Sequence, residues 1–225
     1  MNGEAIVAGI DGARHGWVAC TVNLTSSTVT FRQAPSLGAL WDERWVAVGI
    51  DMPLGLPARE RRSADTDARR ILGTRHSTLF ATPLHATLAA DTYPDALARS
   101  RAAGDRGLSK QAFNLLPRIR EVRRWLEGPR PHVHEVHPET SFTVMNRGTP
   151  LVAKTTNDGR RQRRGLLAAW IPALPGDLDA AAVPVIDALD AAAAAWTAAR
   201  VSAGTHLVLG DDGVDPDGYR LTMAV

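Results

Sequence analysis

The sequence predicts an α/β fold on a mixed sheet, with an antiparallel three-strand meander, later parallel strands and flanking helices. Three observations carry this prediction. The apolar segment Ala5 to Ile10 precedes two alternating segments, Trp17 to Val22 and Thr28 to Phe31, and turn residues separate the last two. Two further buried-looking strands follow, Trp45 to Ile50 and Val133 to Val136. Long helical patterns separate and follow these two strands, as in parallel sheets flanked by helices.

The helices are predicted from apolar periodicity and from capping residues. Ser36 begins a short helix that ends at about Asp42, and Ser109 is a candidate N-cap for a longer one. The longer predicted helices are about Asp65 to Leu72, Asp95 to Ala102, Ser109 to Glu127, Gly159 to Trp170 and Val185 to Val201. We expect one domain, residues 1–225, with a helical insertion at about 54–130 and a C-terminal hairpin over Thr205 to Val225.

Composition indicates an ordinary globular protein. The chain has 225 residues, of which 44% are hydrophobic and 22% charged, with a formal net charge of +2. Cys20 is the single cysteine and lies in a predicted strand, so an intrachain disulfide is excluded and a reducing cytoplasmic location is expected. The apolar stretch Ala188 to Ala199 is too short to span a bilayer, so no membrane partner is expected.

Acidic residues stand at the ends of three predicted strands. Asp11 follows the first strand, Asp51 follows the fourth and Glu135 lies at the end of the fifth. If these strands are neighbours, their acids converge at one edge of the sheet. Asp187 and Asp190 lie about one turn apart on the late helix, which can pack across that edge and add one or both.

Converging carboxylates repel one another and need cations or protons at neutral pH. Carboxylate oxygens favour Mg²⁺ or Mn²⁺ over zinc, and two such ions are the usual means of phosphodiester cleavage. A zinc site at His132, His134 and His137 is disfavoured because no second Cys or His cluster completes it. A single Asp after a strand is usually a turn former, and Asp187 also fits a first-turn helix acid. The metal prediction therefore depends on the joint placement of these acids.

Three more residues near the strand ends carry candidate chemistry. His137 and Glu139 flank Pro138; the histidine is a candidate proton shuttle, and the glutamate is an alternative metal ligand to Glu135. Lys154 precedes a predicted helix and is a candidate contact for a phosphate or for transition-state charge. A solvated loop lysine is the plain alternative.

The arginines occur in clusters that are either solvated helix faces or a surface for a phosphate backbone. The clusters are Arg59, Arg61, Arg62, Arg69 and Arg70; Arg118, Arg120, Arg123 and Arg124; and Arg160, Arg161, Arg163 and Arg164.

Several motifs occur in the order of one known family. They are Gly9-Ile10-Asp11-Gly12 with Gly16-Trp17, Ile50-Asp51-Met52-Pro53-Leu54-Gly55-Leu56-Pro57, Asp65 with Ala68-Arg69 and Leu72-Gly73, Leu79-Phe80-Ala81-Thr82-Pro83, Gly107-Leu108-Ser109, Glu135-Val136-His137-Pro138-Glu139-Thr140-Ser141-Phe142, Lys154 to Gly159, and Asp187-Ala188-Leu189-Asp190-Ala191. Over roughly residues 6 to 200 the chain resembles the domain of unknown function 429 family, a set of predicted RNase H-like nucleases.

The resemblance implies an RNase H-like fold with acids at a metal site. By position, it makes Asp11 the first-strand acid, Asp51 the fourth-strand acid and Asp190 the late-helix acid, with Glu135 or Glu139 completing the group. The chain departs from the expected pattern at Thr155, where a second basic residue should follow Lys154. This departure weakens a phosphate role for that loop.

We therefore expect a Mg²⁺- or Mn²⁺-dependent nuclease that acts on nucleic acid, DNA or RNA. A nucleotide-binding phosphotransferase or ATPase is the second hypothesis, because such proteins share a strand–Asp–Gly opening. They generally need two such domains, and 225 residues without a repeat do not supply both. A non-catalytic interaction domain is the third. The oligomeric state stays open, and a homodimer is compatible with the sequence.

Overall fold

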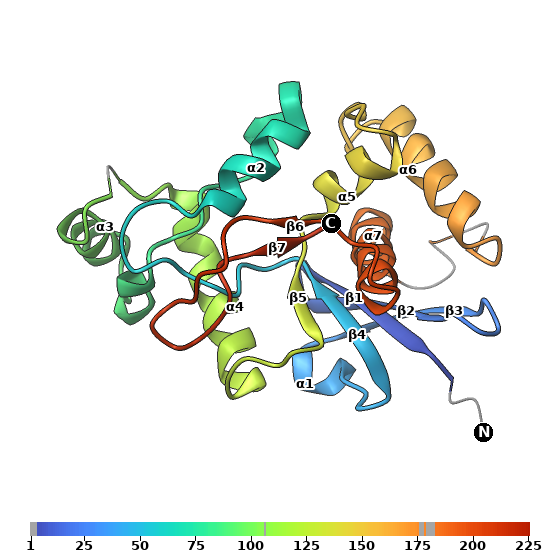
Figure 1. Cartoon of the computed structure of the whole chain (residues 1–225), viewed down its shortest axis with the longest axis horizontal. Helices are drawn as coiled ribbons and strands as arrows, with labels where there is room; N and C mark the ends of the chain where they lie inside the picture. The colour runs from blue at the N-terminus through green and yellow to red at the C-terminus, as the bar shows by residue number, and fades with distance from the viewer. Residues whose placement is uncertain (1–3, 106, 176–177, 179–182) are drawn as a thin grey trace. The chain divides into compact units, whose positions relative to one another are not determined.

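The computed structural model describes residues 4–105, 107–175, 178 and 183–225 (Figure 1). Contacts divide the chain into two compact units. The first comprises Met1–Met52, Pro131–Leu207 and Ala224–Val225, and the second comprises Pro53–Arg130 and Val208–Met223. The second unit thus contains the helical insertion expected at about 54–130, together with a C-terminal segment.

The first unit is built on a five-stranded mixed sheet with the order β3-β2-β1-β4-β5. The strands are β1 (Ile6–Ala13), β2 (Gly16–Asn23), β3 (Val29–Ala34), β4 (Trp45–Ile50) and β5 (Val133–Glu135). The first three form the predicted antiparallel meander, and β4 and β5 continue the sheet in parallel with β1. The first, fourth and fifth strands are therefore neighbours, and the α/β fold is consistent with the RNase H-like description.

Four helices of the first unit surround this sheet: α1 (Leu37–Leu40), α5 (Pro138–Met145), α6 (Asn157–Trp170) and α7 (Val185–Ser202). Helix α7 packs against β1, β2 and β4, and α5 and α6 pack against α7 (Figure 1). Helix α5 was not predicted, although Pro138 at its start is well suited to the first turn of a helix. Within the described part of the chain, no helix has the length and hydropathy needed to cross a membrane.

The second unit is largely helical. Its helices are α2 (Ser63–Leu72), α3 (Tyr93–Ala102) and α4 (Lys110–Leu126), with 3₁₀ helices η1 (Gly73–Thr78) and η2 (His85–Ala89). Ser109 caps α4 as predicted, because its side chain accepts a hydrogen bond from the Ala112 amide. The predicted C-terminal hairpin is reduced to β6 (Val208–Leu209), β7 (Met223–Ala224) and a bridge between Val214 and Arg220.

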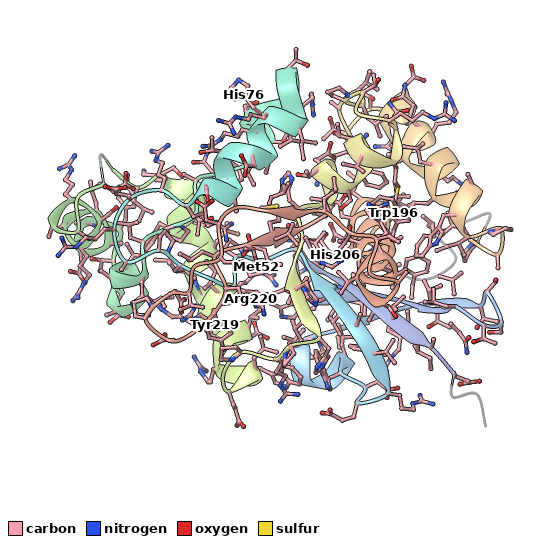
Figure 2. The ribbon with its side chains drawn as sticks, in the orientation of Figure 1. Met52, His76, Trp196, His206, Tyr219 and Arg220 are labelled. Atoms are coloured by element: carbon pink, nitrogen blue, oxygen red, sulfur yellow. The ribbon has the colours of Figure 1, made fainter. Side chains whose placement is uncertain are left out.

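A buried arginine organises the second unit. The Arg123 guanidinium donates to Asp215 at 2.6 Å and to Asp217 at 2.5 Å, and it also donates to the Leu54 carbonyl. It lies 4.2 Å from the ring centroid of Tyr219, which is labelled in Figure 2. Asp215 also accepts a hydrogen bond from the Leu56 amide, so this network holds the loop after residue 52.

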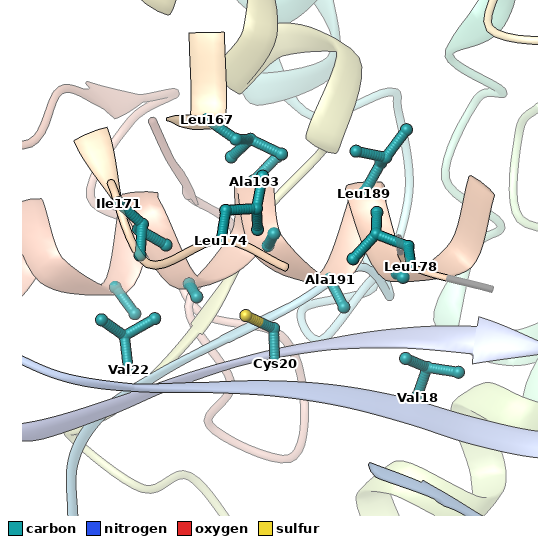
Figure 3. Close-up of a cluster of buried hydrophobic side chains, with 14 of the residues drawn as sticks. Val18, Cys20, Val22, Leu167, Ile171, Leu174, Leu178, Leu189, Ala191 and Ala193 are labelled. Atoms are coloured by element: carbon teal, nitrogen blue, oxygen red, sulfur yellow. The ribbon is translucent and has the colours of Figure 1, made fainter. Parts of the chain in front are cut away.

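Apolar side chains fill the space between α7 and one face of the sheet. Val7 in β1 belongs to this core. So do Val18, Cys20 and Val22 in β2, which Figure 3 labels. They follow the two-residue alternation of a strand, as the sequence pattern indicated. Burial raises the pKa of the Cys20 thiol above its ordinary value, in keeping with a core residue.

Two glycines let the backbone of α7 touch the sheet directly. Gly9 and Gly49 are partners in the parallel register of β1 and β4. A Cβ atom on Gly9 would lie 2.0 Å from the Ala191 carbonyl oxygen, and one on Gly49 would lie 2.5 Å from the Ala194 carbonyl oxygen. Side chains at these two positions are therefore excluded, and α7 is held at a fixed height above the strands.

We predict that Gly9→Ala destabilises the protein by about 3 kcal/mol, because the new methyl group would overlap helix backbone that cannot move aside. Gly165→Ala is the matched control. Gly165 lies inside α6 with open space around it, so the same change should stabilise the helix by about 0.5–1 kcal/mol. Urea unfolding measures both changes, and equal effects of the two substitutions would contradict the close packing.

Candidate functional site

Asp11 and Asp51 lie where the parallel pairing of β1 and β4 ends. The last pair in register is Ile10 with Ile50, and the Asp51 amide donates to the Ile10 carbonyl at 2.8 Å. The prediction placed Asp11 at the end of the first strand, but Asp11 lies within β1. The strand continues into the hairpin with β2 and pairs Asp11 with Val18. Strand alternation places Asp11 on the same face as Gly9, toward α7.

Asp190 reaches the same place from α7. It immediately precedes Ala191, whose carbonyl oxygen marks the closest approach of the helix to Gly9. Asp190 is 1% exposed, and Asp11 is also buried. The side chains of Asp11 and Asp51 lie within mutual reach, and each affects the pKa of the other.

Burial and mutual repulsion disfavour the charged forms of all three acids. Burial, followed by repulsion from Asp51 and Asp190, raises the pKa of Asp11 well above its usual range. Burial and the charge of Asp190 raise the pKa of Asp51 to about 7. Burial also raises the pKa of Asp190 to about 6, although Lys154 limits that rise. This pattern is typical of carboxylates arranged for a cation or for proton transfer.

Lys154 supplies the positive charge at this cluster. Its Nζ atom lies 2.5 Å from Oδ2 of Asp190, and its side chain is 39% exposed against 2% for Asp190. Burial works against its charge, but the charge of Asp190, the hydrogen bond to it and the charges of Asp51 and Asp11 together raise the pKa of Lys154 above its ordinary value. The sequence offered a phosphate contact or a solvated loop residue, and the structure places the ammonium group on an acid of the site.

Two further predicted acids stand around the cluster. Glu135 is the last residue of β5, pairs in register with Ile50 and is buried. Its charge contributes to the raised pKa of Asp51. Asp187 lies in the first turn of α7, and its charge contributes to the raised pKa of Asp11. Both therefore add to the negative potential at the site.

Glu139 has a different environment from the other acids. Both of its carboxylate oxygens accept hydrogen bonds from Arg163, at 2.6 and 2.8 Å from Nη2, and neither residue is appreciably exposed. Its charge still contributes to the raised pKa of Asp190. His137 precedes α5, and its Nδ1 atom forms a 2.9 Å hydrogen bond with Thr140. Glu139 is thus paired with an arginine, so a cation at this carboxylate would have to compete with Arg163.

Three arginines of the predicted phosphate-binding clusters are buried in ion pairs. Arg163 pairs with Glu139, Arg123 with Asp215, and Arg62 with Asp65 at 2.7 Å. A guanidinium group that is buried against a carboxylate is not presented to a phosphate backbone. The prediction that these three arginines lie at the surface was wrong. The sequence does not show that each has a buried carboxylate as its partner.

The donor set of the cluster fits a hard divalent cation. Asp11, Asp51 and Asp190 offer carboxylate oxygens, and Oδ1 of Asp190 is buried without a hydrogen-bond partner. Among the described residues, no three His, Cys, Asp or Glu side chains are gathered closely enough to hold an ion as they stand. A cation would have to draw these acids together, and it would meet Lys154 at Asp190.

Arg163→Met should destabilise the protein by about 3–5 kcal/mol, because it leaves the Glu139 carboxylate buried without its partner. Arg161→Met is the matched control on the same helix. Arg161 pairs with Asp158 at the solvent-exposed surface, and the substitution should lower the free energy of unfolding by less than about 1 kcal/mol. Chemical denaturation distinguishes the two variants, and a similar small loss in both would show that Glu139 does not depend on Arg163.

Without divalent ions, we predict that stability falls as pH rises from about 4 to about 7. In this range the folded protein holds protons on Asp11, Asp51 and Asp190 that the unfolded chain, with carboxyl pKa values near 4, has lost. Urea unfolding in a chelator measures this slope. Asp51→Asn should flatten it, and an unchanged slope in that variant would contradict the raised pKa of Asp51.

A family model described as "Protein of unknown function (DUF429)" matches residues 9–213. The matched range contains Asp11, Asp51, Glu135, Lys154 and Asp190, and so it covers every element of the acidic cluster. No curated protein and no solved structure matches the chain. Because the match extends over most of the sequence, the chain belongs to the DUF429 family.

Proposed function

We propose that this protein is a divalent-metal-dependent nuclease that hydrolyses phosphodiester bonds in nucleic acid, with Mg²⁺ or Mn²⁺ held by Asp11, Asp51 and Asp190. The observation that carries the proposal is the buried, unpartnered Oδ1 of Asp190 beside two further acids whose pKa values are raised. A buried oxygen without a partner is costly, and a cation would satisfy it.

The chain would contribute two things to such a reaction. Asp11 in β1, Asp51 directly after β4 and Asp190 on α7 would bind the cation, and packing of the helix on the two strands sets their relative position. Glu135 and Asp187 would strengthen the negative potential that attracts it. A bound Mg²⁺ or Mn²⁺ supplies water activation and stabilisation of the leaving oxygen.

The substrate class is supported by the basic residues that remain accessible. Arg160, Arg161 and Arg164 lie on α6, in the helix that follows the Lys154 loop, and they are exposed or partly exposed. Exposed guanidinium groups near a metal site are suited to a phosphate backbone. The RNase H-like fold and nuclease activity implied by the family resemblance agree with this proposal.

Asp190→Asn and Asp11→Asn should each abolish cleavage of DNA or RNA and weaken Mn²⁺ binding while leaving the protein folded. For the wild type, Mn²⁺ at about a hundred times its Kd should raise the free energy of unfolding by about 2.7 kcal/mol. Titration calorimetry, thermal unfolding and a panel of single-stranded, double-stranded and branched substrates provide the measurements.

Asp158→Asn is the control, because Asp158 is an exposed acid on α6 that pairs with Arg161 at the surface. Its metal binding and cleavage should equal those of the wild type. Wild-type cleavage by Asp11→Asn would refute the catalytic proposal. Failure of the wild type to bind Mn²⁺ would favour a non-catalytic interaction domain, and stabilisation by ATP instead would favour a nucleotide-binding protein.

A further inference from the structure

Two buried carboxylates of the first unit are neutralised in different ways. Arg163 donates to both oxygens of Glu139, so both oxygens of that carboxylate already have a cationic partner. Lys154 contacts only Oδ2 of Asp190, and Oδ1 of Asp190 stays buried without a partner. Both oxygens of Glu139 are hydrogen-bonded, whereas only one oxygen of Asp190 is.

The two members of the Lys154–Asp190 pair differ in their freedom to move. The side chain of Asp190 is buried, and the residue lies on the helix whose backbone packs on Gly9 and Gly49. The Lys154 side chain is 39% exposed and extends from a turn before α6, so it can swing into solvent without disturbing the core. Any exchange of partners at Asp190 must therefore occur by departure of the lysine.

The type of basic residue at position 154 fits this role. The chain contains 24 arginines and only two lysines, Lys110 and Lys154. An arginine fork would occupy both oxygens of Asp190, as Arg163 does at Glu139, whereas an ammonium group is a single point charge on a flexible stem. A lysine can neutralise Asp190 and still leave one of its oxygens without a partner.

We propose that Lys154 is a built-in exchangeable cation that occupies Asp190 until a divalent ion displaces it, and that it thereby sets the metal affinity of the site. This inference rests on the proposed metal-binding function. A divalent ion beside Asp190 and an ammonium group on its Oδ2 would repel each other at close range. Metal binding and the Lys154–Asp190 ion pair are therefore alternatives, and the released ammonium group becomes available to an anionic substrate.

Calorimetric titration with Mn²⁺ alone tests the proposal. Lys154→Gln removes the competing charge, and we expect it to bind Mn²⁺ about ten-fold or more tightly than the wild type. Lys154→Arg provides a guanidinium group that can donate to both oxygens of Asp190, so this variant should bind Mn²⁺ more weakly than the wild type. Lys110→Gln is the control, because Lys110 is exposed on α4 and should leave the affinity unchanged.

A second measurement follows the lysine itself. Mn²⁺ should increase the labelling of Lys154 by an amine-reactive reagent relative to Lys110, as measured by peptide mass spectrometry of the folded wild type. Equal Mn²⁺ affinity in the wild type and in Lys154→Gln, or unchanged labelling of Lys154 at saturating Mn²⁺, overturns the exchange while the metal site stands. Absence of Mn²⁺ binding in the wild type and in Lys154→Gln overturns both this inference and the proposed function.

Discussion

The candidate site depends on direct contact between the backbone of one helix and two strands. Gly9 and Gly49 stand side by side in β1 and β4, and neither can carry a side chain without meeting the backbone of α7. The helix has small residues at this contact: Ala191, Ala194 and Ala195 form the surface that faces the two glycines. Asp190 then cannot shift relative to Asp11 and Asp51 unless the core itself moves. The geometry of the acids is thus a consequence of packing.

The sequence contains enough local information to predict the framework of this site. Strand alternation, turn residues and acids at strand ends are short-range signals, so the meander, the neighbouring strands and the late helix with Asp190 were predicted correctly. Helix α5 was missed because His137-Pro138-Glu139 was interpreted as a strand end, although proline at a first turn is a helix-start signal. That signal was available and would have placed Glu139 on a helix.

Long-range pairing of charges could not be predicted in the same way. Glu139 and Arg163 are 24 residues apart, and Lys154 and Asp190 are 36 apart. An arginine in a helix looks the same in sequence whether it faces solvent or a buried carboxylate. Arg123 in the second unit repeats the arrangement seen at Arg163, since its partner Asp215 is 92 residues away. Richness in arginine is therefore partly an internal structural feature of this chain.

The acidic cluster opposes the stability of the fold that contains it. Positions 11, 51 and 190 adjoin a core rich in valine, alanine and leucine, where an apolar side chain would avoid both desolvation and repulsion. Burial raises the pKa values of all three acids. At neutral pH the folded state is therefore destabilised, either by repulsion between the carboxylates or by the need to keep them protonated. A single lysine offsets this in part. Carboxylates held together by packing, at a cost to stability, are better explained by a ligand of opposite charge than by any contribution to the fold.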